Sequence, residues 1–99
     1  MARKVQLESK FQRGLKDDIL KRFPGSKVFK ITNAQGYPDL LILYGKHWAT
    51  LECKRESGAH RQPNQPYYVD EMNAMSFSRF VYPENKKEVL DDLQSAFET

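Results

Sequence analysis

The sequence has few cysteines and histidines, the residues that form disulfides and bind zinc. It contains one cysteine, Cys53, so no disulfide can form within the chain, and a single thiol is typical of a reducing, cytoplasmic setting. Its two histidines, His47 and His60, have no second His or Cys at a metal-ligand spacing. We therefore expect both histidines at the surface and no zinc site.

Long apolar runs are also missing. No segment approaches the length of a membrane span, and the first residues are charged rather than signal-like. Of the 99 residues, 39% are apolar and 29% charged, which is typical of a folded protein. We expect a single domain over residues 1–99, located in the cytoplasm and without membrane contacts.

Positive charge is concentrated at one end. Residues 1–30 hold nine Lys or Arg against three Asp or Glu, residues 31–83 hold five of each, and residues 84–99 hold two against five. A basic N-terminal third favours a polyanionic partner, with nucleic acid as the first candidate. It is equally typical of a solvated, lysine-rich helix face, so charge alone does not decide the function.

Hydrophobic periodicity divides the chain into seven elements. In order they are a helix from about residue 5 to 23, strands over 28–32, 39–44 and 47–54, a helix over 64–75, a strand over 77–82 and a helix opened by Pro83. This order predicts an α/β fold of αβββαβα type, with a mixed central sheet flanked by helices.

The first helix carries an apolar stripe with a carboxylate inside it. The stripe recurs every fourth residue, at Leu7, Phe11, Leu15, Ile19 and Phe23. Glu8 falls in the middle of that arc, and a metal ion is one reason for a carboxylate there. Asp18 and Arg22 also fall within the arc, where they are expected to pair with each other at the i,i+4 spacing. Glu8 is therefore a candidate metal ligand. The simpler alternative is that charged side chains within this arc form ion pairs along the helix, as expected for Asp18 and Arg22.

The central motif is Tyr37-Pro38-Asp39 followed, after twelve residues, by Glu52-Cys53-Lys54. Alternate side chains of a strand share a face, so Glu52 and Lys54 project together while Cys53 turns toward the core. Asp39 opens the neighbouring strand, and a hairpin brings its carboxylate beside Glu52. A turn cap at Asp39 and an exposed surface pair at the other two are the plain alternatives. An unpaired carboxylate in a central strand is costly, however, which favours a site.

Two adjacent carboxylates favour a hard divalent cation. They repel each other unless positive charge lies between them, and oxygen ligands suit Mg²⁺ or Mn²⁺. Such an ion polarises a phosphate oxygen and activates water, and Lys54 would orient that water and neutralise developing negative charge. Asp39, Glu52 and Lys54 thus indicate metal-dependent phosphodiester hydrolysis.

This pattern resembles the PD-(D/E)XK nuclease superfamily over residues 7–97, and most closely the minimal VRR-NUC nucleases and small, phage-type Holliday junction resolvases. The element order matches their restriction-endonuclease-like core. Asn33, Gly36, Pro38 and Asp39 look like the entry to the second strand. The resemblance implies that Glu8 and the Cys53 backbone carbonyl complete the metal site. It also implies an active-site role for Gln65.

What the resemblance implies is a Mg²⁺- or Mn²⁺-dependent endodeoxyribonuclease, a homodimer that nicks branched or junction DNA. If a phage encodes the chain, its setting is the host-cell cytoplasm. The alternatives are a sequence-specific endonuclease of restriction or homing type and a non-catalytic nucleic-acid-binding module. The candidate DNA contacts are Lys4, Lys10, Arg13, Asn33, His60 and Arg61. The aromatic side chains expected in the core or an interface, rather than stacked on bases, are Trp48, Tyr67, Tyr68, Phe77 and Phe80.

Overall fold

The computed structural model describes the backbone of residues 2–32 and 35–99, with side chains from residue 7 onward. Asn33 and the side chain of Lys4, two candidate DNA contacts, lie outside the described residues. The elements are α1 (Ala2–Arg22), β1 (Lys27–Lys30), β2 (Leu40–Tyr44), β3 (His47–Cys53), α2 (Asn64–Met75), β4 (Phe77–Val81), the short 3₁₀ helix η1 (Pro83–Asn85) and α3 (Lys86–Phe97). The predicted αβββαβα order is confirmed.

The four strands form one mixed sheet in the order β1-β2-β3-β4. β1 pairs antiparallel with β2, and β2 pairs antiparallel with β3. β3 and β4 run parallel, which requires the crossover through α2. A tight turn at Gly45 and Lys46 joins β2 to β3, with a φ of 61° at Gly45 that suits glycine. β3 is therefore an interior strand, and its side chains are covered on both faces.

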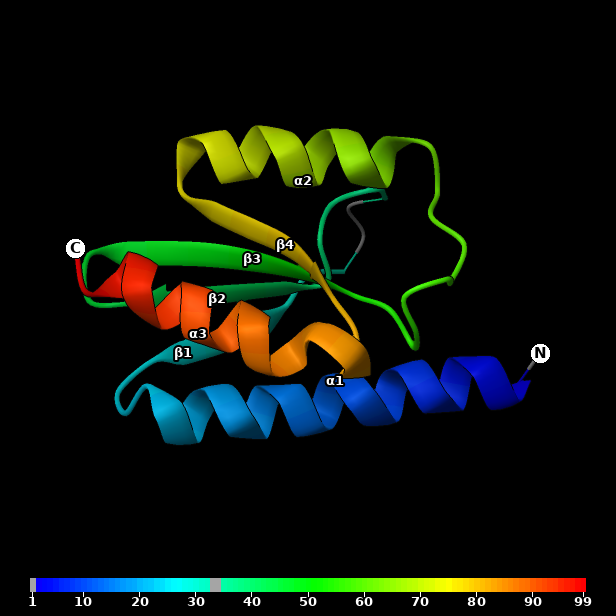
Figure 1. Ribbon diagram of the computed structural model, residues 1–99, viewed down its shortest axis with the longest axis horizontal. Helices are drawn as coiled ribbons and strands as arrows, with labels where there is room; N and C mark the ends of the chain where they lie inside the picture. Colours follow the sequence, from blue (N-terminus) through cyan, green and yellow to red (C-terminus); the bar gives the residue numbers. More distant parts are fainter. Residues whose placement is uncertain (1, 33–34) are drawn as a thin grey trace.

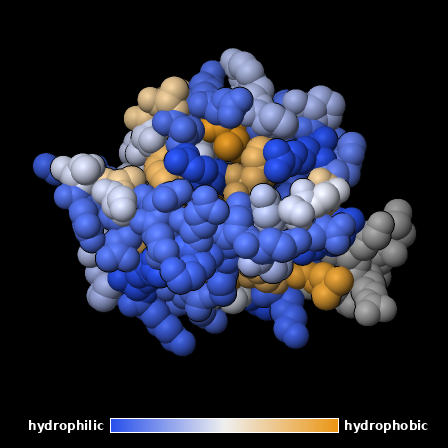
Figure 2. Space-filling view, viewed as in Figure 1, coloured by the Kyte–Doolittle hydropathy of each residue, from blue (hydrophilic) through white to orange (hydrophobic). Residues whose placement is uncertain are grey.

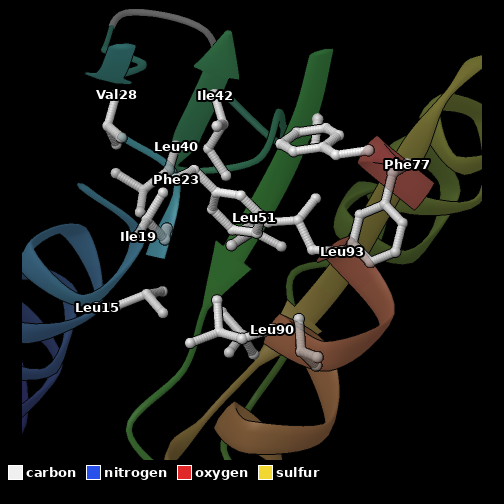
Figure 3. Packing of buried hydrophobic residues seen from close by; sticks show 14 of the residues in the cluster. Leu15, Ile19, Phe23, Val28, Leu40, Ile42, Leu51, Phe77, Leu90 and Leu93 are labelled. Atoms are coloured by element: carbon white, nitrogen blue, oxygen red, sulfur yellow. The ribbon is translucent and has the colours of Figure 1, made fainter. Parts of the chain in front are cut away.

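Helices cover both faces of the sheet. Figure 1 shows α2 on one face and α1 with α3 on the other. The apolar core lies between the sheet and the α1–α3 layer, where Leu15, Ile19 and Leu93 pack against strand residues such as Leu51 (Figure 3). The α2 side is thinner and more polar: Val69 is the buried residue of that helix. Strand side chains facing α2 thus lie outside the main core.

α1 is longer than the sheet that it covers. Its 21 residues span about 30 Å, whereas the seven residues of β3 span roughly 23 Å. Leu15, Ile19 and Phe23 are buried, but Leu7 is 49% exposed because this part of the helix projects past the strands. Figure 2 shows apolar atoms on that part of α1, next to the grey atoms. The predicted apolar stripe is therefore buried only in its C-terminal half.

Ion pairs join α1 to α3 instead of forming within α1. Asp18 accepts a hydrogen bond from Lys86 Nζ at 2.6 Å, and Arg22 donates to Asp91 at 2.9 Å. The expected i,i+4 pair between Asp18 and Arg22 is wrong, because α3 brings opposite charges to both side chains. These contacts join α1 to α3 near the surface.

Among the described residues, no helix has both the length and the hydrophobicity that a membrane crossing requires.

Candidate active site

A polar cavity of about 210 Å³ opens at the end of the sheet where β2 begins and β3 ends. The projecting half of α1 closes one side, and the first turn of α2 closes another. The residues that line it are Glu8, Ser9, Gln12, Lys30, Asp39, Glu52, Lys54 and Gln65. The structure thus gathers five candidate site residues, predicted from four separate segments, into one cavity; their roles stay predictions.

The β2–β3 hairpin brings the first two carboxylates together. Leu40 is paired with Leu51, so the next position outward sets Asp39 opposite Glu52. Asp39 is held firmly, because its Oδ2 accepts the backbone N–H of Cys53 at 2.8 Å and the preceding Pro38 is fully buried. The carboxylate of Asp39 therefore faces its neighbour before any ligand arrives.

Glu52 lies in an environment that disfavours its charge. It is 2% exposed, and its Oε1 is buried without a hydrogen-bond partner. Burial raises the pKa of Glu52 to about 9, with further contributions from hydrogen bonding to Asp39 and from its charge, while Lys54 opposes the shift. Burial, more than the nearby Asp39 charge, likewise raises the pKa of Glu8. The cavity concentrates carboxyl groups that need a proton or a cation.

Lys54 is the cation that the chain itself supplies, and Gln65 positions it. Lys54 is 8% exposed, and its Nζ donates to Gln65 Oε1 at 3.0 Å. The same oxygen accepts the backbone N–H of Gln62 at 2.8 Å, which fixes the amide. Gln65 therefore directs the ammonium into the cavity from the first turn of α2.

The carboxylate oxygens of this cavity are suitable ligands for a hard divalent cation. Carboxylate oxygens from Asp39, Glu52 and Glu8 face one cavity, and Glu52 Oε1 lacks the partner that a buried oxygen normally has. Within the described part of the chain, no group of three His, Cys, Asp or Glu side chains is already arranged to hold an ion. The ligand role of the Cys53 carbonyl stays a prediction.

Three further residues of the cavity were missed by sequence reasoning. Lys30 pairs with Leu40 on β2, so the strand register carries it beside Asp39. Ser9 and Gln12 extend the α1 wall, and Gln12 hydrogen bonds to the Cys53 thiol, whose pKa is nonetheless raised by burial. The spacing of Gln12 from Glu8, one helical turn, was the available signal. Cys53 itself is buried in the core, as expected.

The remaining candidate DNA contacts are exposed. Lys10 and Arg13 lie on the same part of α1 as Ser9 and Gln12, and His60 lies in the segment after β3. The guanidinium of Arg61 lies 3.8 Å from the centroid of the Phe80 ring. Their contacts with DNA stay predictions.

Two of the aromatic residues expected in the core or an interface lie in different surroundings. Phe77 is buried, as the core interpretation requires, but Tyr67 is 60% exposed. Tyr67 is therefore not a core residue, because it lies on the side of α2 that faces away from the sheet.

A solved structure described as a VRR_NUC domain matches the chain with a TM-score of 0.66 at 18% sequence identity. The match covers 86% of this chain and 95% of that domain. The chain has a VRR_NUC-type fold. This is the fold that the sequence resemblance implied. No protein-family model and no curated protein sequence matches the chain, and an identity of 18% speaks for the fold alone.

Proposed function

We propose that the chain is a metal-dependent endonuclease that hydrolyses DNA phosphodiester bonds in the cavity between Asp39 and Glu52. The observation that carries the proposal is the buried Glu52, with its unpartnered Oε1, opposite Asp39 in a VRR_NUC-type fold. A buried carboxylate beside a second one is destabilising, and Lys54 offsets only part of that cost, which supports a bound cation.

Each residue has a separate task in this mechanism. Asp39, Glu52 and Glu8 would hold Mg²⁺ or Mn²⁺ through their carboxylate oxygens, together with the Cys53 carbonyl. The ion, when bound, supplies Lewis-acid polarisation of the phosphate and of water. Lys54 orients the attacking water and stabilises negative charge that develops on phosphorus. Gln65 keeps the Lys54 ammonium aimed into the cavity.

The finer proposal is a structure-selective enzyme that acts on junction DNA as a homodimer. One chain carries one such carboxyl pair, so cutting two strands requires two subunits, and a two-fold dimer suits a two-fold substrate. A sequence-specific restriction or homing enzyme would instead need contacts to base edges. The cytoplasmic location stays a prediction.

A cleavage assay on matched DNA forms tests the proposal. Labelled four-way junction, linear duplex of the same sequence and single strand are incubated with and without Mg²⁺ or Mn²⁺. We expect metal-dependent cuts in the junction and at least a hundredfold loss of rate in Lys54→Ala. Lys46→Ala, in the exposed turn at the opposite end of the sheet, is the control and should cut normally.

Each alternative has its own result in that assay. Equal cutting of duplex and junction would reject structure selectivity, and cuts at one defined sequence would favour the restriction or homing type. DNA binding without hydrolysis in any metal would reject the enzyme and favour a binding module.

A further inference from the structure

Three tyrosines form an exposed aromatic cluster beside the cavity. The rings of Tyr37 and Tyr68 are stacked, with centroids 4.0 Å apart and planes 22° apart. Tyr67 meets Tyr68 edge to face at 5.2 Å and 74°. Although aromatic clusters usually fill cores, Tyr67 is 60% and Tyr37 38% exposed. The cluster therefore presents ring surface to solvent.

The cluster has contacts on both sides. The side chain of Asn64 fills the space beside Gly36, so the loop before Asp39 packs on the first turn of α2. That packing seats Tyr37 on Tyr68. The hydroxyl of Tyr67 donates to Glu71 at 3.0 Å, one helical turn away, which fixes the third ring. Because the rings are already in place, a ligand that stacks on them would order few protein side chains when it binds.

The position of the cluster ties it to the cavity. Tyr37 comes two residues before Asp39. Tyr68 follows Gln65 by three residues on α2, so the two side chains share one side of the helix about 4.5 Å apart along its axis. The rings of Tyr37 and Tyr68 therefore lie within reach of a nucleotide next to one whose phosphate occupies the cavity, and Tyr67, edge to face with Tyr68, extends the ring surface further around α2.

We propose that Tyr37, Tyr67 and Tyr68 form a stacking subsite for an unpaired DNA base next to the cleaved phosphate. This rests on the proposed nuclease function and deepens it. Aromatic side chains stack on any base, whereas a base within a duplex is already stacked on its neighbours. Glu71 adds negative charge at Tyr67, which suits a neutral base and disfavours a phosphate. The subsite would select DNA with splayed or unpaired nucleotides.

Fluorescence of 2-aminopurine tests this directly. The probe is placed at an unpaired position of a junction or overhang, and in a fully paired duplex of the same length, and binding is measured with Ca²⁺ in place of Mg²⁺. Stacking on Tyr67 should quench the unpaired probe. We expect Tyr67→Ala to lose the quenching and to bind the unpaired DNA roughly tenfold more weakly, with duplex binding unchanged.

Two variants keep the test specific. Tyr67→Phe retains the ring and should bind and quench like the parent chain. Met75→Ala removes an equally exposed apolar side chain, 65% exposed at the other end of α2, and should change nothing. Equal losses on paired and unpaired DNA, or no loss in Tyr67→Ala, would overturn the stacking subsite.

Sedimentation of the same variants separates a protein interface from a base subsite. Dissociation of a dimer in Tyr67→Ala would show that the cluster is an interface and overturn the proposal. Failure of the nuclease function has a different signature, since the parent chain would then cut no DNA in Mg²⁺ or Mn²⁺. If the parent chain cuts DNA and Tyr67→Ala is equally active and selective, the stacking subsite is wrong and the nuclease function stands.

Discussion

At the scale of single residues, the chemistry of Glu52 comes from its surroundings. Its position in β3 removes it from water, Asp39 faces it across the hairpin, and Lys54 offsets only part of the resulting penalty. The ordinary pKa of this group, 4.5, rises to about 9. The folded chain therefore retains a proton that the unfolded chain releases, in the absence of metal.

This difference predicts a pH-dependent stability. Between pH 4.5 and 9 the folded state binds more protons than the unfolded state, so the free energy of unfolding falls as pH rises through that window. The slope is at most about 1.4 kcal/mol per pH unit. Urea unfolding of metal-free protein at pH 5, 7 and 9 measures it, and Glu52→Gln should flatten the curve. The same slope in that variant would assign the effect to other groups.

At the scale of elements, the site depends on the loop before β2 and the first turn of α2. Gly36 has a φ of +88°, which strains any other residue, and a side chain there would have to displace the side-chain amide of Asn64. The loop carries Asp39 and Tyr37, while the helix carries Gln65 and Tyr68. A small displacement between these two elements would therefore separate the carboxylate from the lysine that Gln65 holds.

Gly36→Ala tests this coupling, with Gly25→Ala as the matched control. Both glycines have positive φ, near +90°, so each variant should lose about 1–2 kcal/mol of stability through backbone strain. A Cβ at Gly25 meets nothing within 4 Å. We expect Mg²⁺-dependent cutting to fall at least tenfold only in Gly36→Ala, because a 1 Å misplacement of catalytic groups is that costly. Equal activity of the two variants would show that the loop does not position Asp39.

The elements were predictable where a local pattern decides them. The bounds of α2, from Asn64 to Met75, and the β2–β3 hairpin follow from Pro66, Gly45 and the short apolar run over residues 39–44. The convergence of Asp39 and Glu52 followed from the same hairpin. What could not be predicted are contacts between distant segments. The Tyr37–Tyr68 stack joins residues 31 positions apart, and residues of α3 form ion pairs with residues of α1.

At the scale of the whole molecule, the role of the basic N-terminal third depends on where its side chains lie in the fold. α1 extends past the sheet and carries Lys10 and Arg13, both exposed, beside the cavity wall. Acidic residues gather in the C-terminal segment, on α3, where Asp91 pairs with basic partners. Exposed basic side chains are thus carried by the same helix that forms one wall of the cavity.

This distribution predicts a salt-dependent affinity for DNA. Each phosphate contact releases about one counterion, so the slope of log K against log salt should decrease by about two in the double variant Lys10→Ala, Arg13→Ala. Binding of junction DNA is measured between 50 and 200 mM salt, in Ca²⁺. Lys46→Ala, at the opposite end of the sheet, should keep the parent slope. An unchanged slope in the double variant would place the DNA elsewhere on the surface.

The central claim is that Asp39, Glu52 and Glu8 share one divalent cation, and calorimetric titration of the protein with Mn²⁺ at pH 8 tests it most directly. We expect one site per chain in the parent, with proton release as the metal displaces the proton of Glu52, and no measurable binding in Asp39→Asn or Glu52→Gln. Absence of binding by the parent, or undiminished binding by Glu52→Gln, would contradict the claim.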